Sequence, residues 1–481
     1  MQFQVPDLNW VFLAPMTIVT FFAIVVLVLG LEKTKRPEFL NYVGIGGVVL
    51  ALAANVFCLT GYFGTENLTA NGMFTLDYIT TGFNFIFLTV ALLSILASSK
   101  YVKDENIPPN EYFGLMLFAV VGMMVMACGT NLAVIFVGLE VMSIALYILA
   151  GIKKNEMKSL ESALKYFLLG AFASGFFLYG ISMIYGATGT LDLNVMAQKI
   201  STETLEFPII LMVGIAFLIV GFGFKVALVP FHSWTPDVYE GASSPITGFM
   251  SVGAKAAGFA AFVRVFVTAL AGVRTEWTDI LAILAILTMV VGNILALQQT
   301  NFKRLLAYSS ITHAGYLLLG IIAGNDLSAQ AIMFYLFSYA FMNIGAFAII
   351  TLVGNKGEEF VNLSDFTGLG KKKPFVAFML TIFLFSLAGI PPMAGFFGKY
   401  FIFTSLIKSG ANTLAIIGVL NAVVGVYYYL SPIVLMWMKE PNEVEVNDAS
   451  PSLKLALLLS FIGTILIGIF PSQVMHFLFQ I

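Results

Sequence analysis

Long apolar runs, each about the length of one membrane-spanning helix of roughly 20 residues, recur along the whole chain. Fourteen such segments can be counted, at approximately 8–31, 42–63, 77–99, 111–128, 131–152, 160–187, 206–229, 243–271, 278–298, 305–323, 327–353, 374–407, 411–438 and 455–475. We therefore expect an all-α polytopic membrane protein with 14 transmembrane helices. Because fourteen is an even number, both termini are expected on the same side.

The composition excludes most other classes. Of the 481 residues, 59% are hydrophobic and 10% charged, whereas about 25% of the residues in soluble domains are charged. The formal net charge of −2 gives no reason to expect a nucleic-acid partner. The two cysteines, Cys58 and Cys128, lie inside apolar runs, so no disulfide, iron–sulfur cluster or metal site is expected. The start, "MQFQVPDLNW", resembles no removable signal peptide.

Lysine and arginine follow the predicted spans in an alternating pattern. Most of the 24 residues fall in odd-numbered connections, and the even-numbered connections and termini hold only Lys199, Arg274 and Lys408. By the positive-inside rule, the odd connections are cytoplasmic and both termini external. No connection is long enough for a soluble catalytic domain. Chemistry is therefore expected inside the membrane or in partner subunits.

An internal repeat is visible in two places. "TNLAVIFVGLEVMSIALYILAG" (130–151) resembles "TNFKRLLAYSSITHAGYLLLGIIAG" (300–324), and "GFGFKVALVPF" (221–231) resembles "GFFGKYFIFTS" (395–405). The second copy lies five helices after the first. Because five is an odd number, the two copies have inverted orientation in the membrane, an architecture found in transporters. We therefore expect an N-terminal three-helix segment (1–110), two inverted repeats (111–271 and 278–438) and a C-terminal helix (455–481).

The run at 374–407 is too long for one straight crossing. Pro391 and Pro392 lie near its middle and remove backbone donors, so a broken helix is expected there. Broken helices at membrane depth occur where they face protein or a wet cavity. The break therefore indicates a functional region.

Six titratable residues inside the spans are candidates for function, because a charge at the bilayer centre costs about 2.5–3.5 kcal/mol even on lenient scales. Glu140 and Lys255 lie near mid-span. Lys225 and Lys399 occupy matched positions in the repeat, although each is also close enough to a span end to snorkel. The other two candidates, with lower priority, are Lys165 and His313.

Ordinary structural roles remain open for the lower-priority residues. Lys165 follows Glu161 by one turn, so an ion pair on one helix explains it. His313 is either a hydrogen-bonded core histidine or a proton-transfer group. Arg264, near the outer end of its span, is more consistent with an electrostatic tuner or anchor. A lysine withdrawn from water can exchange its proton near neutral pH, whereas Na⁺ needs several oxygen ligands, so this set favours protons.

The stretch "VPFHSWTPDVYEGASSPITGFMSVGAKAAGF" (229–259) resembles the signature of the proton-conducting antiporter-like subunits of respiratory complex I. Within that family, "PDVYEGA" (236–242) is similar to the N branch rather than to the L or M branches. The absence of a long C-terminal lateral helix, and Lys399 where the M branch has glutamate, point the same way. The resemblance covers essentially the whole chain.

The resemblance implies two inverted half-channels, each built on a broken helix, in a proton-translocating NADH:quinone oxidoreductase of a bacterial inner membrane. It implies that Glu140 and Lys225 form a central pair, that Lys255 leads toward Lys399, and that Lys165 and His313 support this pathway. It also implies that FMN, iron–sulfur clusters and quinone are bound by partner subunits, including other antiporter-like subunits, and that this chain holds no cofactor. The competing prediction is a subunit of a multi-subunit cation/proton antiporter, and a third is a scaffold that conducts nothing.

Overall fold

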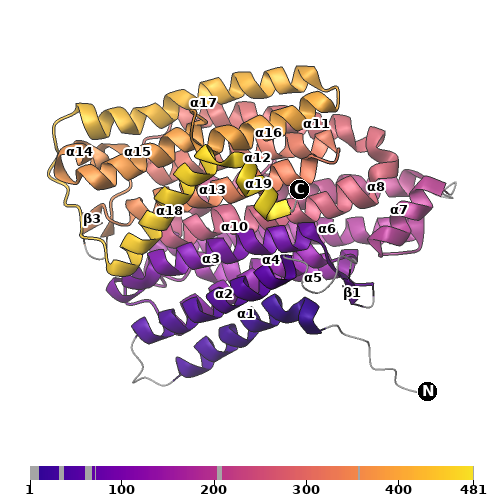
Figure 1. Ribbon diagram of the computed structural model, residues 1–481, viewed down its shortest axis with the longest axis horizontal. Coiled ribbons are helices and arrows are strands. Elements are labelled where there is room, and N and C mark those ends of the chain that lie inside the picture. Colours follow the sequence, from indigo (N-terminus) through magenta and orange to yellow (C-terminus); the bar gives the residue numbers. More distant parts are fainter. Residues whose placement is uncertain are drawn as a thin grey trace.

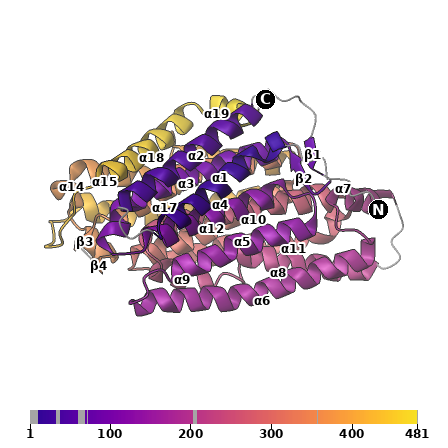
Figure 2. The same ribbon diagram turned by 90° about the horizontal axis from the view of Figure 1, so that it is seen from below.

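The computed structural model is almost entirely helical, with long helices lying side by side (Figures 1 and 2). It describes residues 10–31, 37–59, 68–70, 72–202, 208–355 and 358–479. The α-helices are α1 (Trp10–Leu29), α2 (Pro37–Leu59), α3 (Tyr78–Asp104), α4 (Pro109–Cys128), α5 (Leu132–Ala150), α6 (Met157–Thr188), α7 (Leu193–Thr202), α8 (Pro208–Val226), α9 (Trp234–Gly241), α10 (Ser244–Phe262), α11 (Arg274–Leu297), α12 (Phe302–Ala323), α13 (Ser328–Ile350), α14 (Leu369–Lys372), α15 (Pro374–Ala388), α16 (Ala394–Lys408), α17 (Asn412–Met438), α18 (Pro451–Ile469) and α19 (Pro471–Phe479).

Shorter elements connect the helices. A π-helix, η1 (Val263–Ala269), and a 3₁₀ turn, η2 (Ala271–Val273), follow α10, and a second 3₁₀ turn, η3 (Leu363–Phe366), precedes α14. Two antiparallel hairpins pair β1 (Leu68–Ala70) with β2 (Phe74–Leu76), and β3 (Gly354–Asn355) with β4 (Glu358–Glu359).

Within the described residues, twelve helices are long and apolar enough to cross a membrane. They are α2 to α6, α8, α10 with η1, α11 with η2, α12, α13, α17 and α18. Two shorter apolar helices, Leu13–Leu29 and Pro374–Ala388, coincide with two more of the predicted segments. The chain is thus a multi-pass helical membrane protein, and the predicted boundaries agree with the observed ones to within a few residues.

Two helical segments are interrupted in the middle of the fold. Helix α15 ends at Ala388 and α16 begins at Ala394, so the break lies at the predicted prolines. Helix α8 ends at Val226, and the short helix α9 follows after seven residues of turn. At each break, carbonyl groups at the end of the first half-helix accept hydrogen bonds from side chains, Phe224 from Trp234 and Ala388 from Lys399.

Ion pairs and hydrogen bonds of charged side chains divide the helix ends into two groups. One group joins only odd-numbered connections, through the pairs Lys103–Glu38, Lys153–Glu105, Lys158–Glu240, Arg304–Asp237 and Lys373–Asp448. We call this end of the molecule the lysine-rich face. The other group joins even-numbered connections, for example Arg274 to the carbonyl oxygens of Ile322 and Ala323; we call this end the opposite face.

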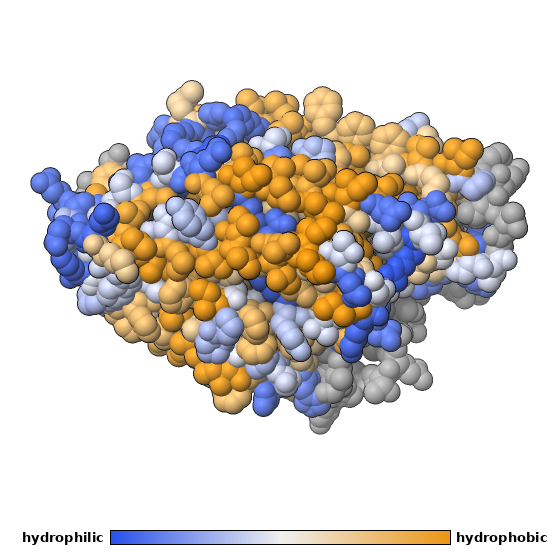
Figure 3. Space-filling model, turned by 90° about the horizontal axis from the view of Figure 1, so that it is seen from above, coloured by the Kyte–Doolittle hydropathy of each residue, from blue (hydrophilic) through white to orange (hydrophobic). Residues whose placement is uncertain are grey.

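Burial is greatest in four central helices. The hydrophobic windows of α3, α10, α12 and α13 are 89–100% buried, whereas those of α2, α6, α11, α17 and α18 are 33–39% buried. The outer helices expose large apolar side chains such as Phe172, Val423 and Tyr427. Hydrophobic residues also cover the middle of the face in Figure 3, with hydrophilic ones gathered largely toward its ends. This is the surface expected of a protein whose sides contact lipid or other membrane subunits.

Candidate functional site

Lys225 lies in the last turn of α8, directly before the first break, and is 4% exposed. Its Nζ donates to Ser143 Oγ at 2.8 Å and lies 3.5 Å from the Tyr166 hydroxyl. The same ammonium lies 5.6 Å from the centre of the Tyr166 ring, within reach of a cation–π interaction. The side chain is therefore held in the interior and does not snorkel toward a membrane surface.

Glu140 lies on α5, half-buried, one turn before Ser143. Its carboxylate accepts a hydrogen bond from Ser174 Oγ on α6 at 2.5 Å. Ser143, Ser174 and Lys225 line one cavity of about 10 Å³, which is about the space that a single water requires. The carboxylate and the ammonium are thus connected through two hydroxyl groups and a water-sized cavity.

Lys255 is fully buried on α10, and its ammonium donates to both the hydroxyl (2.6 Å) and the carbonyl oxygen of Ser310 on α12. One turn further along α10, Gly258 lies against α8. A Cβ at Gly258 would be 2.5 Å from Val226 Cγ1 and 3.7 Å from Lys225 Cγ. Helix α10 therefore approaches the end of α8 closely one turn beyond Lys255.

His313 follows Ser310 by one turn on α12 and is fully buried. Its Nδ1 lies 2.5 Å from the Tyr335 hydroxyl and its Nε2 lies 2.9 Å from the Tyr429 hydroxyl. A neutral imidazole donates from one ring nitrogen and accepts at the other. Because both nitrogens have hydroxyl partners, His313 can take a proton at one and release one at the other.

Lys399 lies on α16, two turns beyond the second break, and is 6% exposed. Its ammonium donates to the carbonyl oxygens of Leu387 (3.2 Å) and Ala388 (2.8 Å), the last residues of α15. It also lies 5.2 Å from the Tyr316 ring centre. The C-terminal end of a helix carries a partial negative charge that favours a cation. The break therefore supplies the binding groups for this lysine.

The predicted candidates thus lie in the protein interior in two groups, which we together call the interior series: Glu140 with Lys225 beside one cavity, and Lys255, His313 and Lys399 on or against α12. Lys165 does not join this interior series. It lies nearer the lysine-rich face, is about 39% exposed, and pairs at 2.6 Å with both Glu161 and Asp237.

A polar cavity of about 190 Å³ surrounds Lys165. It is lined by Lys158, Glu161, Ser162, Lys165, Asp237, Glu240, Gly241 and Arg304. Burial raises the pKa of Asp237, but hydrogen bonds from Lys165 and Arg304 outweigh burial and hold it below the usual value.

Helix α9 connects this cavity to Lys225. It carries Asp237 and begins with Trp234, whose ring stacks on Tyr166 with centroids 4.4 Å apart. The Trp234 indole also donates to the carbonyl oxygen of Phe224, next to Lys225. The charged cavity and Lys225 are therefore separated by two stacked aromatic rings.

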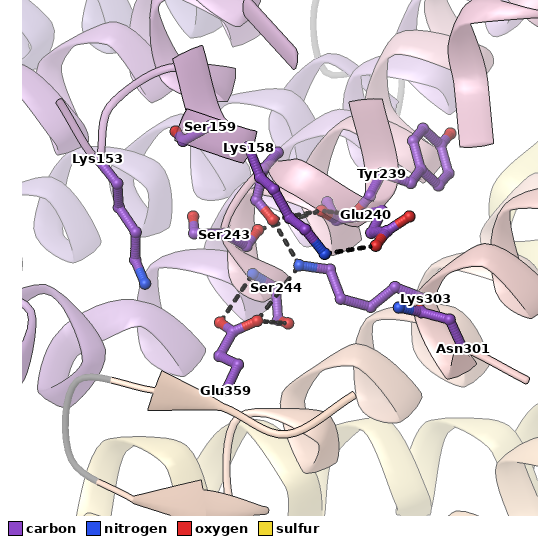
Figure 4. Close-up of polar contacts among 12 residues, drawn as sticks. Lys153, Lys158, Ser159, Tyr239, Glu240, Ser243, Ser244, Asn301, Lys303 and Glu359 are labelled. Carbon is purple, nitrogen blue, oxygen red and sulfur yellow. Dashed lines mark hydrogen bonds and ion pairs between the residues drawn. The ribbon is translucent and has the colours of Figure 1, made fainter. Parts of the chain in front are cut away.

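A buried ion pair at the lysine-rich face was not predicted from the sequence (Figure 4). Lys303 donates to Glu359 (3.2 Å) and to the Ala242 carbonyl oxygen (2.5 Å), and Glu359 accepts from the backbone nitrogen and hydroxyl of Ser244 at the start of α10. Burial raises the pKa of Glu359, but Lys303 and the Ser244 hydroxyl lower it to about 2. The sequence held one indication of this site, "SSP" at 243–245. This pattern is typical of a helix start, where backbone N–H groups need an acceptor.

The chain is similar to known membrane subunits along nearly its whole length. Residues 129–425 match the family model described as NADH:quinone oxidoreductase/Mrp antiporter, transmembrane. The NADH-quinone oxidoreductase subunit N of Trichlorobacter lovleyi is 46% identical over 446 residues, covering 92% of this chain and 91% of that protein.

Two solved structures share the fold. A chain of respiratory complex I from Thermus thermophilus with bound aureothin has a TM-score of 0.82 and 34% identity, covering 96% of this chain and 98% of that one. A chain of the Mrp complex from Dietzia sp. has a TM-score of 0.84 and 19% identity, covering 98% and 96%. At 19% identity, the second likeness concerns the fold alone.

Proposed function

Because this chain belongs to the NADH:quinone oxidoreductase/Mrp antiporter family, we propose that it is the N-type membrane-arm subunit of a proton-translocating NADH:quinone oxidoreductase. The observation that carries the proposal is the interior series of titratable side chains, with Lys225, Lys255, His313 and Lys399 each buried and each bound to hydroxyl or carbonyl groups. Such residues inside a membrane are costly and are by default parts of ion or proton pathways.

In the proposed mechanism, the distance between Glu140 and Lys225 controls the proton affinity of the lysine. When the carboxylate approaches, it favours the charged ammonium; when it withdraws, the proton is expelled. Ser174 binds Glu140, Ser143 binds Lys225, and both serines line the same water-sized cavity, which supports a coupling between the two charges. Moving one charge against 100 mV requires about 2.3 kcal/mol, which corresponds to a change of about 1.7 pKa units.

From Lys225 the proton would pass to Lys255, then by way of Ser310 and His313 to Lys399, which releases it on the opposite face. Ser310 and His313 lie one turn apart on α12 and contact Lys255 and the Tyr335 hydroxyl, respectively. Tyr335 packs against Gly398, the residue before Lys399. Electron transfer in partner subunits would drive the cycle, and FMN, iron–sulfur clusters and quinone would be bound there.

For the membrane topology we propose fourteen crossings: the twelve long helices, α1, and α15 with α16 as one broken helix. Spans at 111–271 and 278–438 would form two inverted repeats, with 1–110 and 455–481 outside them. The first break between α8 and α9 and the second between α15 and α16 support this assignment. The lysine-rich face would be cytoplasmic, with both termini external, in a bacterial inner membrane.

Lys225→Ala tests this function in inverted membrane vesicles, with NADH-driven proton uptake and quinone reductase rate measured together. A loss of both by at least fivefold, with the complex assembled, is expected. Lys408→Ala is the matched control, because Lys408 is an exposed lysine at the end of α16. The competing assignment, a cation/proton antiporter subunit, requires lost Na⁺/H⁺ exchange and unchanged NADH-driven activity in the same vesicles.

A further inference from the structure

Arg264 lies in the π-helix η1 at the opposite face and is 6% exposed. Its two terminal nitrogens donate to the two carboxylate oxygens of Asp77 at 2.5 and 2.6 Å, and one of them also donates to Thr80 Oγ1 at 2.8 Å. Paired parallel bonds of this kind are strong and geometrically specific. Asp77 in turn caps the first turn of α3 by accepting from the Thr80 backbone nitrogen at 2.9 Å.

The same guanidinium also binds α4. Its Nε donates to the carbonyl oxygen of Ala127 at 2.9 Å, a helix-end group with no partner in the next turn. Arg264 therefore joins three helix ends at the opposite face: the start of α3, the end of α4 and the end of the span that carries Lys255. The π-helix is the local feature that places it there, and such bulges often occur at functional sites.

Between Lys255 and Arg264 the protein is apolar. Residues 256–263 of this span carry no polar side chain and are all buried. Phe262 packs against Phe222 and Phe266 with ring centroids 4.7 and 4.9 Å apart, and Phe222 also contacts Phe177 at 4.8 Å. Phe222 lies one turn before Lys225, so this aromatic layer covers the opposite-face side of both lysines.

A small cavity of about 10 Å³ lies beside the ion pair. Thr80, which binds Arg264, and Asn84 both line it, and the buried Oδ1 of Asn84 has no hydrogen-bond partner. A polar group of this kind normally binds water. The cavity thus offers room for a water molecule between α1, α3 and α4, one residue away from the ion pair through Thr80.

The two ends of the first repeat therefore differ. On the lysine-rich face, Asp237 of α9 lines a charged cavity of about 190 Å³, and the same short helix carries Trp234, whose ring stacks on Tyr166 next to Lys225. On the opposite face, an ion pair and an aromatic layer intervene. We propose that Arg264 and Asp77 form a lock that holds α3, α4 and α10 together over the aromatic layer and prevents protons from leaking between the opposite face and Lys255.

This inference rests on the proposed proton pathway and adds a barrier to it: Arg264 is a positioning residue, and its loss should open a leak. The step is a simple movement of a proton along water that enters when the three helix ends separate. Because leakage runs down an imposed gradient, it requires no electron transfer. The experiment can therefore fail independently of the pumping assignment.

The test is the decay of an imposed pH difference across membrane vesicles that contain the assembled complex, followed with a pH-sensitive dye without NADH. Asp77→Asn is the first variant, because asparagine still caps a helix well while the ion pair is lost. Arg264→Gln is the second. Both are expected to accelerate the decay at least threefold.

Arg274→Gln is the matched control. Arg274 also binds helix-end carbonyl groups at the opposite face, those of α12, but it does not lie over the span of Lys255. In vesicles with Arg274→Gln, the pH difference should decay at the same rate as in vesicles with the unmodified complex. Wild-type decay in assembled Asp77→Asn or Arg264→Gln vesicles would overturn the lock, and so would an equal leak from Arg274→Gln.

Discussion

The ammonium of Lys399 lies 2.8 Å from the carbonyl oxygen of Ala388, the last residue of the helix that precedes the second break. Lys225 relates differently to the first break, because it belongs to the helix that ends there and reaches sideways to Ser143. Each lysine is thus buried at a helix end, but only Lys399 is held by the free carbonyl groups of another half-helix. Changes at the second break should therefore affect Lys399 directly.

Gly389→Ala tests this dependence. Gly389 has a φ of +86°, and a Cβ there would lie 3.0 Å from Lys399 Nζ. We expect a loss of NADH-driven proton uptake of at least threefold, because the added methyl group displaces the ammonium. Gly410→Ala is the control, since its φ is +85° but nothing lies within 4 Å of the added Cβ. If both variants lose proton uptake equally, backbone strain alone explains the effect, and contact with Lys399 does not.

Tyr335→Phe should slow proton transfer without preventing assembly. The Tyr335 hydroxyl is a direct partner of His313, and its removal interrupts the series between Lys255 and Lys399. Tyr112→Phe removes a comparably buried hydroxyl, bound to Ser98, outside the series. Each change should cost about 0.5–1.5 kcal/mol of stability. Only Tyr335→Phe should reduce the number of protons taken up per NADH oxidised, measured in the same vesicles.

Asp237→Asn should lower proton uptake by about twofold to fivefold at pH 7, less than Lys225→Ala. The carboxylate holds Lys165 and Arg304 at the charged cavity, and the low pKa of Asp237 keeps it ionised throughout the neutral range. Asp448→Asn, which breaks an exposed pair with Lys373, is the matched control and should be silent. If Asp237→Asn takes up protons at the wild-type rate, this cavity is not part of the proton pathway.

Glu359→Gln should destabilise the assembled complex at neutral pH. The native pKa of Glu359, about 2, lies below its ordinary value of 4.5, so the carboxylate contributes stability that is present above pH 4.5 and is lost as pH falls toward 2. The difference in thermal stability between the variant and the unmodified complex should be constant from pH 8 to pH 5 and narrow below about pH 4.5. Glu440→Gln, at an exposed pair with Lys371, should show little difference at any pH.

Much of the fold could be predicted from the sequence because its signals are local. The apolar runs gave the long helices to within a few residues, and Pro391 and Pro392 located the second break. The alternation of lysine and arginine agrees with the way the helix ends pair in the structure, from Lys103–Glu38 to Lys373–Asp448. The first break was implied only by the family resemblance, because the segment before Pro230 reads as one continuous apolar run.

The candidate site was predicted only as a set of residues. Counting along a span left open whether Lys225 and Lys399 snorkel, and burial in the structure shows that neither does. The ion pair of Lys165 with Glu161 followed from their spacing, but the second partner, Asp237, lies 72 residues away. Lys303 and Glu359 were missed altogether, because one reads as a span-edge lysine and the other as a loop carboxylate.

By itself, the sequence determined that this chain is a multi-pass helical membrane protein and which charged residues fall within its apolar runs. Hydropathy and helix breaking act over neighbouring residues, so they can be read from a linear sequence. Only the tertiary structure decided which polar groups meet: Lys225 with Ser143, His313 with Tyr335, and Arg264 with Asp77. In a bilayer the hydrophobic effect does not distinguish one apolar helix face from another, so these meetings depend on the detailed packing of helices far apart in the chain.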